Sequence, residues 1–213
     1  MRIVVGLSGA SGVVYGIRLL EVLRTVPDVE THLIVSPAAK QTMTYETDRT
    51  LREVADLADY SYSFRDIAAA PSSGSFRTAG MIICPCSMRT LSGVAMSSDN
   101  NLLVRAADVV LKERRRLVLV TRETPLHLGH LRLMVQATEI GAVIAPPVPA
   151  FYTRPRSIDN IVDYTVHRVL DLFDISVPEE DIRRWPAVKA EREQPISVVH
   201  DAHFGGRELE SRS

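Results

Sequence analysis

Two short polar segments contain the residues whose types and spacing suit the binding of an anion. The first, SGASG at residues 8–12, follows an apolar stretch and precedes an apolar helical pattern. The second, PCSMRT at residues 85–90, follows the apolar run 79–84 in the same way. A turn from a strand into a helix exposes backbone N–H groups, and these groups with nearby hydroxyls bind phosphate. The sequence therefore predicts a site for a phosphate-bearing ligand at two strand ends.

The glycine-rich turn allows several interpretations, because glycine spacing alone is a weak signal. A P-loop has a lysine directly after its last glycine, and Val13 stands there. A nicotinamide site usually has an acidic residue at the end of the second strand, where this chain has Ser36. We favour the phosphate of a mononucleotide, and a tight turn that binds no ligand stays open as the alternative.

The elements that must position these segments alternate along the chain. The apolar runs predict strands at residues 3–7, 31–36, 60–64, 79–84, 116–121 and 142–145. Helical patterns are predicted at residues 13–24, 37–47, 51–58, 88–97, 102–113, 125–140, 158–173 and 178–184, with Thr124 and Pro125 starting the sixth. Such alternation is typical of a parallel sheet covered on both faces, which binds ligands at its carboxyl edge where the winding reverses. A reversal between the first and fourth strands would make the two polar segments neighbours.

Length and composition fit one soluble α/β domain. The 213 residues are 46% hydrophobic and 24% charged, and a net charge of −1 gives no electrostatic argument for nucleic acid or an anionic membrane. No apolar run approaches the roughly 18 to 20 residues that span a bilayer, and the N-terminus does not resemble a signal peptide, so we expect a cytoplasmic protein. Residues 1–185 are predicted as a single domain and 186–213 as a loosely ordered tail. Cys84 and Cys86 flank Pro85 and are predicted to be packing residues.

Six motifs in order resemble those of the flavin prenyltransferases, the UbiX/Pad1 family: GASG at 9–12, SGSFRT at 73–78, CPCSMRTLSG at 84–93, RAADVVLKE at 105–113, RETPLHLGHL at 122–131 and PPVPAFY at 146–152. The resemblance implies a Rossmann-like three-layer α/β/α domain with a parallel six-stranded sheet in the order 3-2-1-4-5-6, assembled as a dodecamer. It implies transfer of a dimethylallyl group from dimethylallyl phosphate to N5 and C6 of reduced FMN. The product, prenylated FMN, is the cofactor of UbiD-type decarboxylases.

The resemblance also assigns site residues. FMN binding is implied for Gly9, Ala10, Ser11, Ser36, Ser87, Met88, Arg89, Thr90 and Arg122. Catalytic positions are implied for Ser11, Glu46, Arg105, Lys112 and Glu123, and donor binding for Tyr152, Arg168 and Trp185. Glu123 is expected to protonate the leaving phosphate and then to accept the C6 proton. Some relatives have tryptophan where this chain has Ile67, which leaves open how the allylic cation is stabilised.

The chain lacks the aspartate-rich cluster that binds magnesium in most prenyl transfer from a diphosphate, and the acidic run 179–181 fits the first turn of a helix. Arginine, lysine and tyrosine around a monophosphate, without a metal, are consistent with this composition. Arg105, Asp108 and Lys112 also fit a solvated salt-bridge stripe. His127 and His130 are a possible metal pair without a third ligand.

Two other functions are weighed against prenyl transfer. An FMN-dependent decarboxylase of cysteine-derived thiols carries a PASANT-like segment and a catalytic histidine, and neither is found here. A non-catalytic flavin carrier that serves a decarboxylase has no need of a cationic site for a prenyl phosphate, but the sequence leaves this function open.

Overall fold

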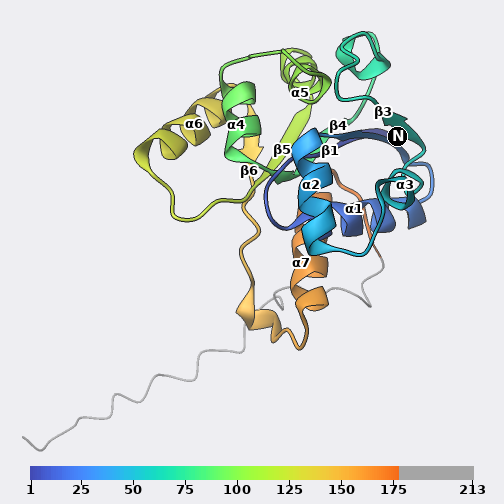
Figure 1. Cartoon of the computed structure of the whole chain (residues 1–213), viewed down its shortest axis with the longest axis vertical. Helices are drawn as coiled ribbons and strands as arrows, with labels where there is room; N and C mark the ends of the chain where they lie inside the picture. Colours follow the sequence, from blue (N-terminus) through green and yellow to red (C-terminus); the bar gives the residue numbers. More distant parts are fainter. Residues whose placement is uncertain (178–213) are drawn as a thin grey trace, which may run out of the picture. The chain divides into compact units, whose positions relative to one another are not determined.

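A six-stranded parallel sheet is the centre of the computed structural model, which describes residues 1–177. Its strands are β1 (Arg2–Leu7), β2 (Glu30–Val35), β3 (Tyr60–Tyr62), β4 (Gly80–Cys86), β5 (Arg116–Thr121) and β6 (Ala142–Ile144). They are paired in the order β3-β2-β1-β4-β5-β6 (Figure 1). The predicted fold class and strand order are therefore confirmed. The predicted helix 178–184, Trp185 and the tail 186–213 lie outside the described residues, so the predicted domain boundary stays a prediction.

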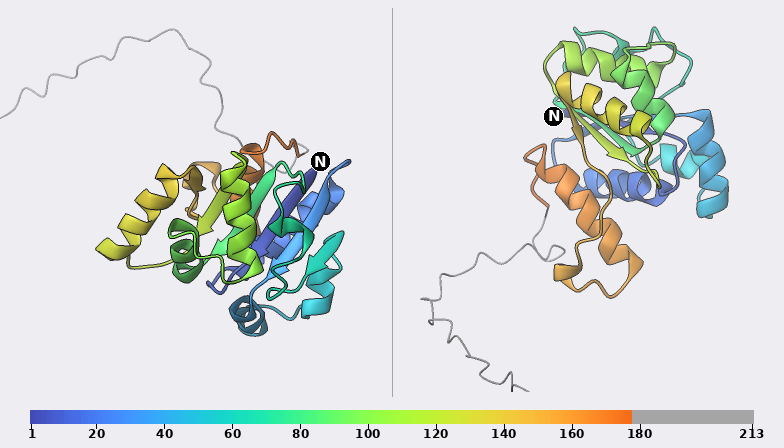
Figure 2. Two further views of the ribbon diagram at one scale, coloured as in Figure 1. Left: turned by 90° about the horizontal axis from the view of Figure 1, so that it is seen from above. Right: turned by 90° about the vertical axis from the view of Figure 1, so that its left-hand side faces the viewer.

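Helices cover both faces of this sheet. They are α1 (Val13–Thr25), α2 (Pro37–Glu46), α3 (Leu51–Ala55), α4 (Met88–Ala95), α5 (Leu102–Lys112), α6 (Leu128–Glu139) and α7 (Ile158–Asp171). Figure 2 shows α1 and α7 on one face and α4, α5 and α6 on the other. Two short 3-10 helices, Ala70–Ser72 and Phe151–Thr153, interrupt the longer loops. The layers are those expected for a sheet whose strands are buried on both faces.

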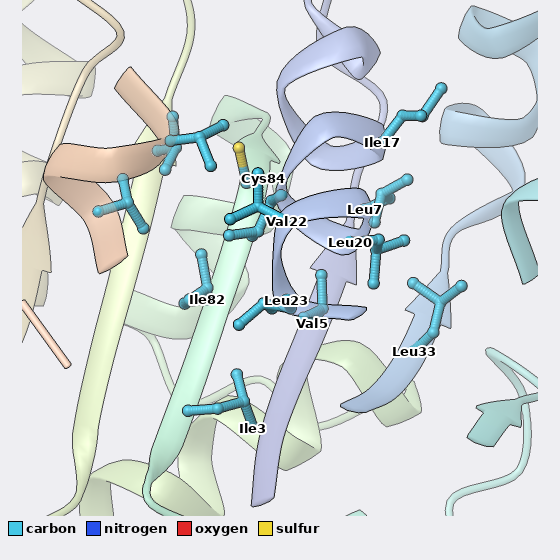
Figure 3. Packing of buried hydrophobic residues seen from close by; sticks show 14 of the residues in the cluster. Ile3, Val5, Leu7, Ile17, Leu20, Val22, Leu23, Leu33, Ile82 and Cys84 are labelled. Atoms are coloured by element: carbon cyan, nitrogen blue, oxygen red, sulfur yellow. The ribbon is translucent and has the colours of Figure 1, made fainter. Parts of the chain in front are cut away.

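Side chains of each strand alternate between two hydrophobic clusters because successive residues point to opposite faces. Ile3, Val5 and Leu7 of β1 pack with α1, as Figure 3 shows, whereas Val4 packs with the cluster under α4 and α5. Gly16 brings α1 very close to the sheet, because a Cβ added there would lie 2.1 Å from the carbonyl oxygen of Cys84. Because β1 lies between β2 and β4, its side chains contribute to the hydrophobic clusters on both faces of the sheet.

The fourth strand and the sixth helix differ from the predictions. β4 does not stop at Pro85 but includes it and continues to Cys86, with a register shift against β5 between Ile83 and Cys86. Proline is found at such irregularities because it has no backbone N–H group to donate to the neighbouring strand. The sixth helix begins at Leu128 and not at Pro125, because the His127 imidazole accepts the Gly129 amide and caps it there. The ends of the other predicted elements agree with the structure within three residues.

None of the helices between residues 1 and 177 is both long and apolar enough to cross a membrane.

Candidate functional site

The two polar turns are neighbours at the carboxyl edge of the sheet. The Ser8 amide donates to the carbonyl oxygen of Pro85 at 3.1 Å, and the Ser8 hydroxyl donates to the same oxygen at 2.9 Å. The Ser87 amide donates to the Ser8 hydroxyl at 2.7 Å. Only 1% of Ser8 is exposed, so these bonds are shielded from water. The reversal of winding between β1 and β4 therefore joins the two turns, as the strand order implied by the family resemblance requires.

A cavity of about 630 Å³ lies beside these turns. Its lining includes Gly9, Ser36, Ser87, Arg89 and Thr90, which are all predicted to bind FMN. The side chain of Ser36 caps α2 and that of Ser87 caps α4, which begins at the cavity. A helix N-terminus with hydroxyls and a guanidinium group attracts a phosphate. The predicted FMN residues Ala10, Ser11, Met88 and Arg122 do not line this cavity.

The first amides of α1 are bonded within the chain. Gly12 and Val13 donate their N–H groups to the Glu46 carboxylate at 2.8 and 2.9 Å. Burial alone would raise the pKa of Glu46, but hydrogen bonds from Ser11, Val13 and Gly12 and the nearby charge of Arg122 hold this pKa below its usual value. Glu46 is therefore an ionised cap on α1, and an external phosphate is better accommodated beside α4.

Arg122 extends the site to the end of β5. Its amide donates to the carbonyl oxygen of Cys86 at 3.1 Å, and its charge acts on both Glu46 and Tyr15. Burial and the neighbouring Cys84 raise the pKa of Tyr15, while Arg122 partly opposes this shift. Glu123 follows with an exposed side chain that accepts the Thr124 amide at 2.9 Å. One acidic, one cationic and one phenolic group, Glu46, Arg122 and Tyr15, thus meet near the start of α1.

Arg105 and Lys112 lie at opposite ends of α5. Arg105 pairs with Asp108 at 3.1 Å and with Asp99 at 3.5 Å, as the salt-bridge interpretation predicts. Lys112 pairs with Glu113 and lies beside Gly74, where an added Cβ would be 2.8 Å from its ammonium nitrogen.

The segment that contains Gly74 marks the amino edge of the sheet. Arg115 donates to the carbonyl oxygens of Gly74 and Phe76 at 2.8 Å each, and β4 and β5 begin just beyond, where Gly80 pairs with Arg116. At about 3.3 Å per residue, β4 separates this edge from Ser87 by roughly 20 Å. The chain therefore does not bring its own Lys112 to the cavity.

The predicted donor residues Tyr152 and Arg168 lie together with Tyr164. The hydroxyl oxygens of Tyr152 and Tyr164 are 2.7 Å apart, and their rings meet edge to face. Arg168, one helical turn after Tyr164, pairs with Asp171 at 2.7 Å. The third predicted donor residue, Trp185, lies outside the described residues.

Two further sequence features have simple structural settings. Ile67 is 58% exposed in the loop between β3 and β4. The rings of His127 and His130 contact each other with centroids 3.6 Å apart. Within residues 1–177, no group of three or more His, Cys, Asp or Glu side chains is placed to hold a metal ion. The histidine pair is therefore best explained as part of the start of α6.

Sequence reasoning missed several residues of this region. Ser8 was not selected, although its position directly after β1 was a usable signal. Tyr15 was missed because it lies on an apolar helix and nothing in the sequence indicates its proximity to Arg122. Phe64 and Asn101 line the cavity from loops that have no motif of their own.

The chain is similar to known proteins over most of its length. The family model described as Flavoprotein matches residues 1–170. The flavin prenyltransferase UbiX of Escherichia coli strain K12 is 65% identical over 184 residues, which cover 86% of this chain and 97% of that protein. A dodecameric FMN-dependent UbiX-like decarboxylase from Escherichia coli O157:H7 is 50% identical, with a TM-score of 0.84 over 87% of this chain and 99% of the other. AnUbiX (PadA1), crystallised with FMN and dimethylallyl pyrophosphate, is 52% identical, with a TM-score of 0.83 over 86% and 96%.

Proposed function

From the membership of this chain in the UbiX flavin prenyltransferase family, we propose that it joins a dimethylallyl group to N5 and C6 of reduced FMN. The product would be prenylated FMN, which a UbiD-type decarboxylase then uses as its cofactor. The observation that carries this proposal is the 630 Å³ cavity at the junction of β1 and β4, where two serine-capped helices begin. Its residues fit a flavin nucleotide by their chemistry as well as by their place in the fold.

FMN is held, on this proposal, between the two turns that Ser8 joins. The hydroxyls of Ser36, Ser87 and Thr90 and the guanidinium group of Arg89 supply donors to the phosphate. The N-terminus of α4 adds its dipole to the same end of the ligand. Because Glu46 already occupies the first amides of α1, the Gly9–Gly12 turn contributes close backbone approach and no open helix terminus.

Transfer requires the allylic C–O bond of the donor to break while the phosphate leaves with the bonding electrons. Tyr152 and Arg168 would hold this phosphate, and Arg105 and Lys112 would add positive charge where negative charge develops. Glu123 would donate a proton to the leaving phosphate and then accept the proton lost from C6. Ser11, hydrogen-bonded to Glu46, would position the transfer of the proton lost from N5 to the double bond of the prenyl group, which lets C6 attack that group and close the ring. We expect these groups to act without a metal ion.

Lys112 can take part only if a second copy of the chain presents it. The cavity of the same chain lies roughly 20 Å from Lys112, along the length of β4. Lys112 and the SGS segment at residues 73–75 lie at the opposite, amino edge of the sheet, which faces outward. A homo-oligomer, with a dodecamer as the expected form, supplies Lys112 from a neighbour. The two interpretations of Arg105 and Lys112, a solvated salt-bridge stripe and a site for the prenyl donor, are then compatible. The ion pairs that these side chains make in the single chain would be replaced by contacts with the donor when the oligomer assembles.

The proposal is tested by anaerobic incubation of the protein with reduced FMN and dimethylallyl phosphate, followed by mass spectrometry of the flavin. A gain of one prenyl unit, unaffected by a chelator, is the expected result. Parallel reactions with the diphosphate define the donor preference. Glu123→Gln should abolish transfer, and Glu139→Gln at the exposed end of α6 is the control for loss of a carboxylate.

Each alternative function has its own outcome in the same experiment. Unchanged FMN together with decarboxylation of a cysteine-derived thiol would establish the decarboxylase. Unchanged FMN with neither reaction would establish a flavin carrier. Full transfer by Glu123→Gln would remove Glu123 from the acid and base roles without affecting the assigned reaction.

A further inference from the structure

Tyr164 lies outside the predicted site but forms a hydrogen bond to Tyr152, a predicted donor residue. Its hydroxyl oxygen lies 2.7 Å from that of Tyr152, which is 45% exposed at the end of the proline-rich loop. The two rings are perpendicular, with centroids 6.0 Å apart. This edge-to-face contact leaves both hydroxyls at the same end of the pair, so Tyr152 is held at its ring and at its oxygen.

The same helix connects Tyr164 to Arg168. The two residues are separated by four positions on α7 and therefore lie on one face. The charge of Arg168 acts on the Tyr164 hydroxyl, and Asp171 fixes the guanidinium group from the next turn at 2.7 Å. Burial and the bond to Tyr152 raise the pKa of Tyr164, so this hydroxyl keeps its proton at neutral pH. Tyr164 is thus linked to Tyr152 by a hydrogen bond and to Arg168 by charge.

We propose that Tyr164 is a positioning residue for the prenyl donor, which orients the Tyr152 hydroxyl toward the donor's phosphate and aligns it with Arg168. This inference rests on the proposed function, which assigns Tyr152 and Arg168 to that phosphate. Tyr164 is not expected to touch the donor itself, because its hydroxyl is already engaged with Tyr152.

The chemistry of the hydroxyl pair gives the reason. A phenol carries one hydrogen and can also accept hydrogen bonds, so Tyr152 can accept from Tyr164 while it donates to a phosphate oxygen. A hydroxyl that accepts one bond becomes a better donor in the next, because chained hydrogen bonds polarise one another. Holding Tyr152 in one orientation also reduces the entropy that is lost when the donor binds. Both effects strengthen the phosphate contact, and neither acts on the flavin cavity.

The test is the variant Tyr164→Phe, which deletes one oxygen atom and keeps the ring contact with Tyr152. Binding of dimethylallyl phosphate to protein loaded with oxidised FMN is measured by calorimetry, where no turnover occurs. We expect the dissociation constant of the donor to rise about fivefold, with FMN affinity unchanged. Under turnover, KM for the donor should rise by a similar factor while kcat changes less.

A double variant separates an indirect role from a direct one. If Tyr164 acts through Tyr152, then Tyr152→Phe/Tyr164→Phe binds the donor no more weakly than Tyr152→Phe alone. The matched control is Tyr62→Phe, on β3. It deletes a hydroxyl that hydrogen-bonds the His32 imidazole at 3.0 Å and should leave donor affinity unchanged.

Four results would overturn or separate the proposals. Unchanged donor affinity in Tyr164→Phe, or equal and additive losses in the double variant, would overturn the positioning role. Wild-type protein that binds the donor but transfers nothing would overturn the proposed reaction, whereas weakened binding by Tyr164→Phe would still support the role of Tyr164. Wild-type protein that binds no donor would overturn both.

Discussion

The Ser8 hydroxyl accepts the backbone amide of Ser87 at 2.7 Å, and this bond joins the two turns that border the candidate flavin cavity. The same hydroxyl donates to the carbonyl oxygen of Pro85, which also accepts the Ser8 amide. A single side chain therefore links the carboxyl ends of β1 and β4, next to the backbone ladder that pairs them. Since Ser87 is the N-cap of α4, this bond also ties the start of that helix to the end of β1.

We expect Ser8→Ala to weaken both folding and FMN binding. The Pro85 carbonyl keeps its bond from the Ser8 amide, but the Ser87 amide loses its acceptor, which costs roughly 1–3 kcal/mol of unfolding free energy. FMN affinity should fall about tenfold because the two turns separate. Urea unfolding and flavin fluorescence titration measure the two effects. Thr165→Val, which removes a buried hydroxyl bonded within α7, is the control and should leave FMN affinity unchanged. Lower stability of Ser8→Ala with full FMN affinity would contradict this role.

Glu46→Gln should change how stability depends on pH. The folded protein lowers the pKa of Glu46, so ionised Glu46 contributes stability that is complete above the ordinary carboxyl pKa and is lost as pH falls through the folded value. Neutral glutamine lacks the charge that interacts with the α1 dipole, and we expect a loss of about 1 kcal/mol at pH 7.

Unfolding experiments between pH 3 and pH 7 would show the stability curves of wild type and Glu46→Gln converging at the acid end. Glu139→Gln changes the net charge by the same amount and should run parallel to the wild type. A gap between wild type and Glu46→Gln that stays constant down to the lowest pH would contradict the ionised cap.

Gly16→Ala should be strongly destabilising. An added Cβ would lie 2.1 Å from the Cys84 carbonyl oxygen, so α1 must move away from β4, at a cost of roughly 1–3 kcal/mol or more. In Gly129→Ala, on exposed α6, the nearest atoms belong to the His127 side chain, which can rotate away and lose only its cap on the helix, at a cost of about 1 kcal/mol. Thermal unfolding should therefore show a clearly larger fall in Tm for Gly16→Ala than for Gly129→Ala, and equal values for the two variants would be the contrary result.

Mixed oligomers test whether Lys112 acts in a neighbouring site. Lys112→Ala and Glu123→Gln should each be inactive in prenyl transfer. When equal amounts of the two chains are unfolded together and reassembled, about one quarter of the sites should combine an intact Lys112 with an intact Glu123 from another chain. Flavin mass spectrometry would then show about one quarter of wild-type activity. No recovery, with assembly verified by light scattering, would place both residues in one chain's site.

The alternation of strand-length apolar runs with helical patterns predicts a parallel sheet covered on both faces, whereas the strand order, and with it the proximity of the two turns, follows from the family resemblance. The Arg105–Asp108 pair was equally predictable from its spacing on α5. The bonds from Glu46 to the start of α1 were not, because 34 residues separate Gly12 from Glu46 and only the tertiary fold brings them together.

Local sequence signals mislead at Pro85 and Pro125, each of which the pattern indicates as the boundary of an element. The pattern indicates that a strand ends at Pro85. In the structure β4 continues through Pro85, whose carbonyl oxygen accepts a hydrogen bond from the Ser8 hydroxyl. Pro125 looked like the first residue of a helix, but the His127 ring supplies the cap two residues later. At Pro85 the contact comes from Ser8, 77 residues away along the chain, whereas at α6 it is local, because His127 caps the helix through the amide of Gly129.

The distance between Lys112 and Ser87 has a consequence for newly synthesised chains. On the proposed arrangement, a lone subunit can retain its flavin but its site lacks Lys112, one of the cations that stabilise the leaving phosphate. Chemistry would then begin only after association, so specific activity should fall on dilution below the assembly threshold. The prenyl donor is thereby protected from ionisation in incomplete oligomers, where water would react with the carbocation before the flavin does.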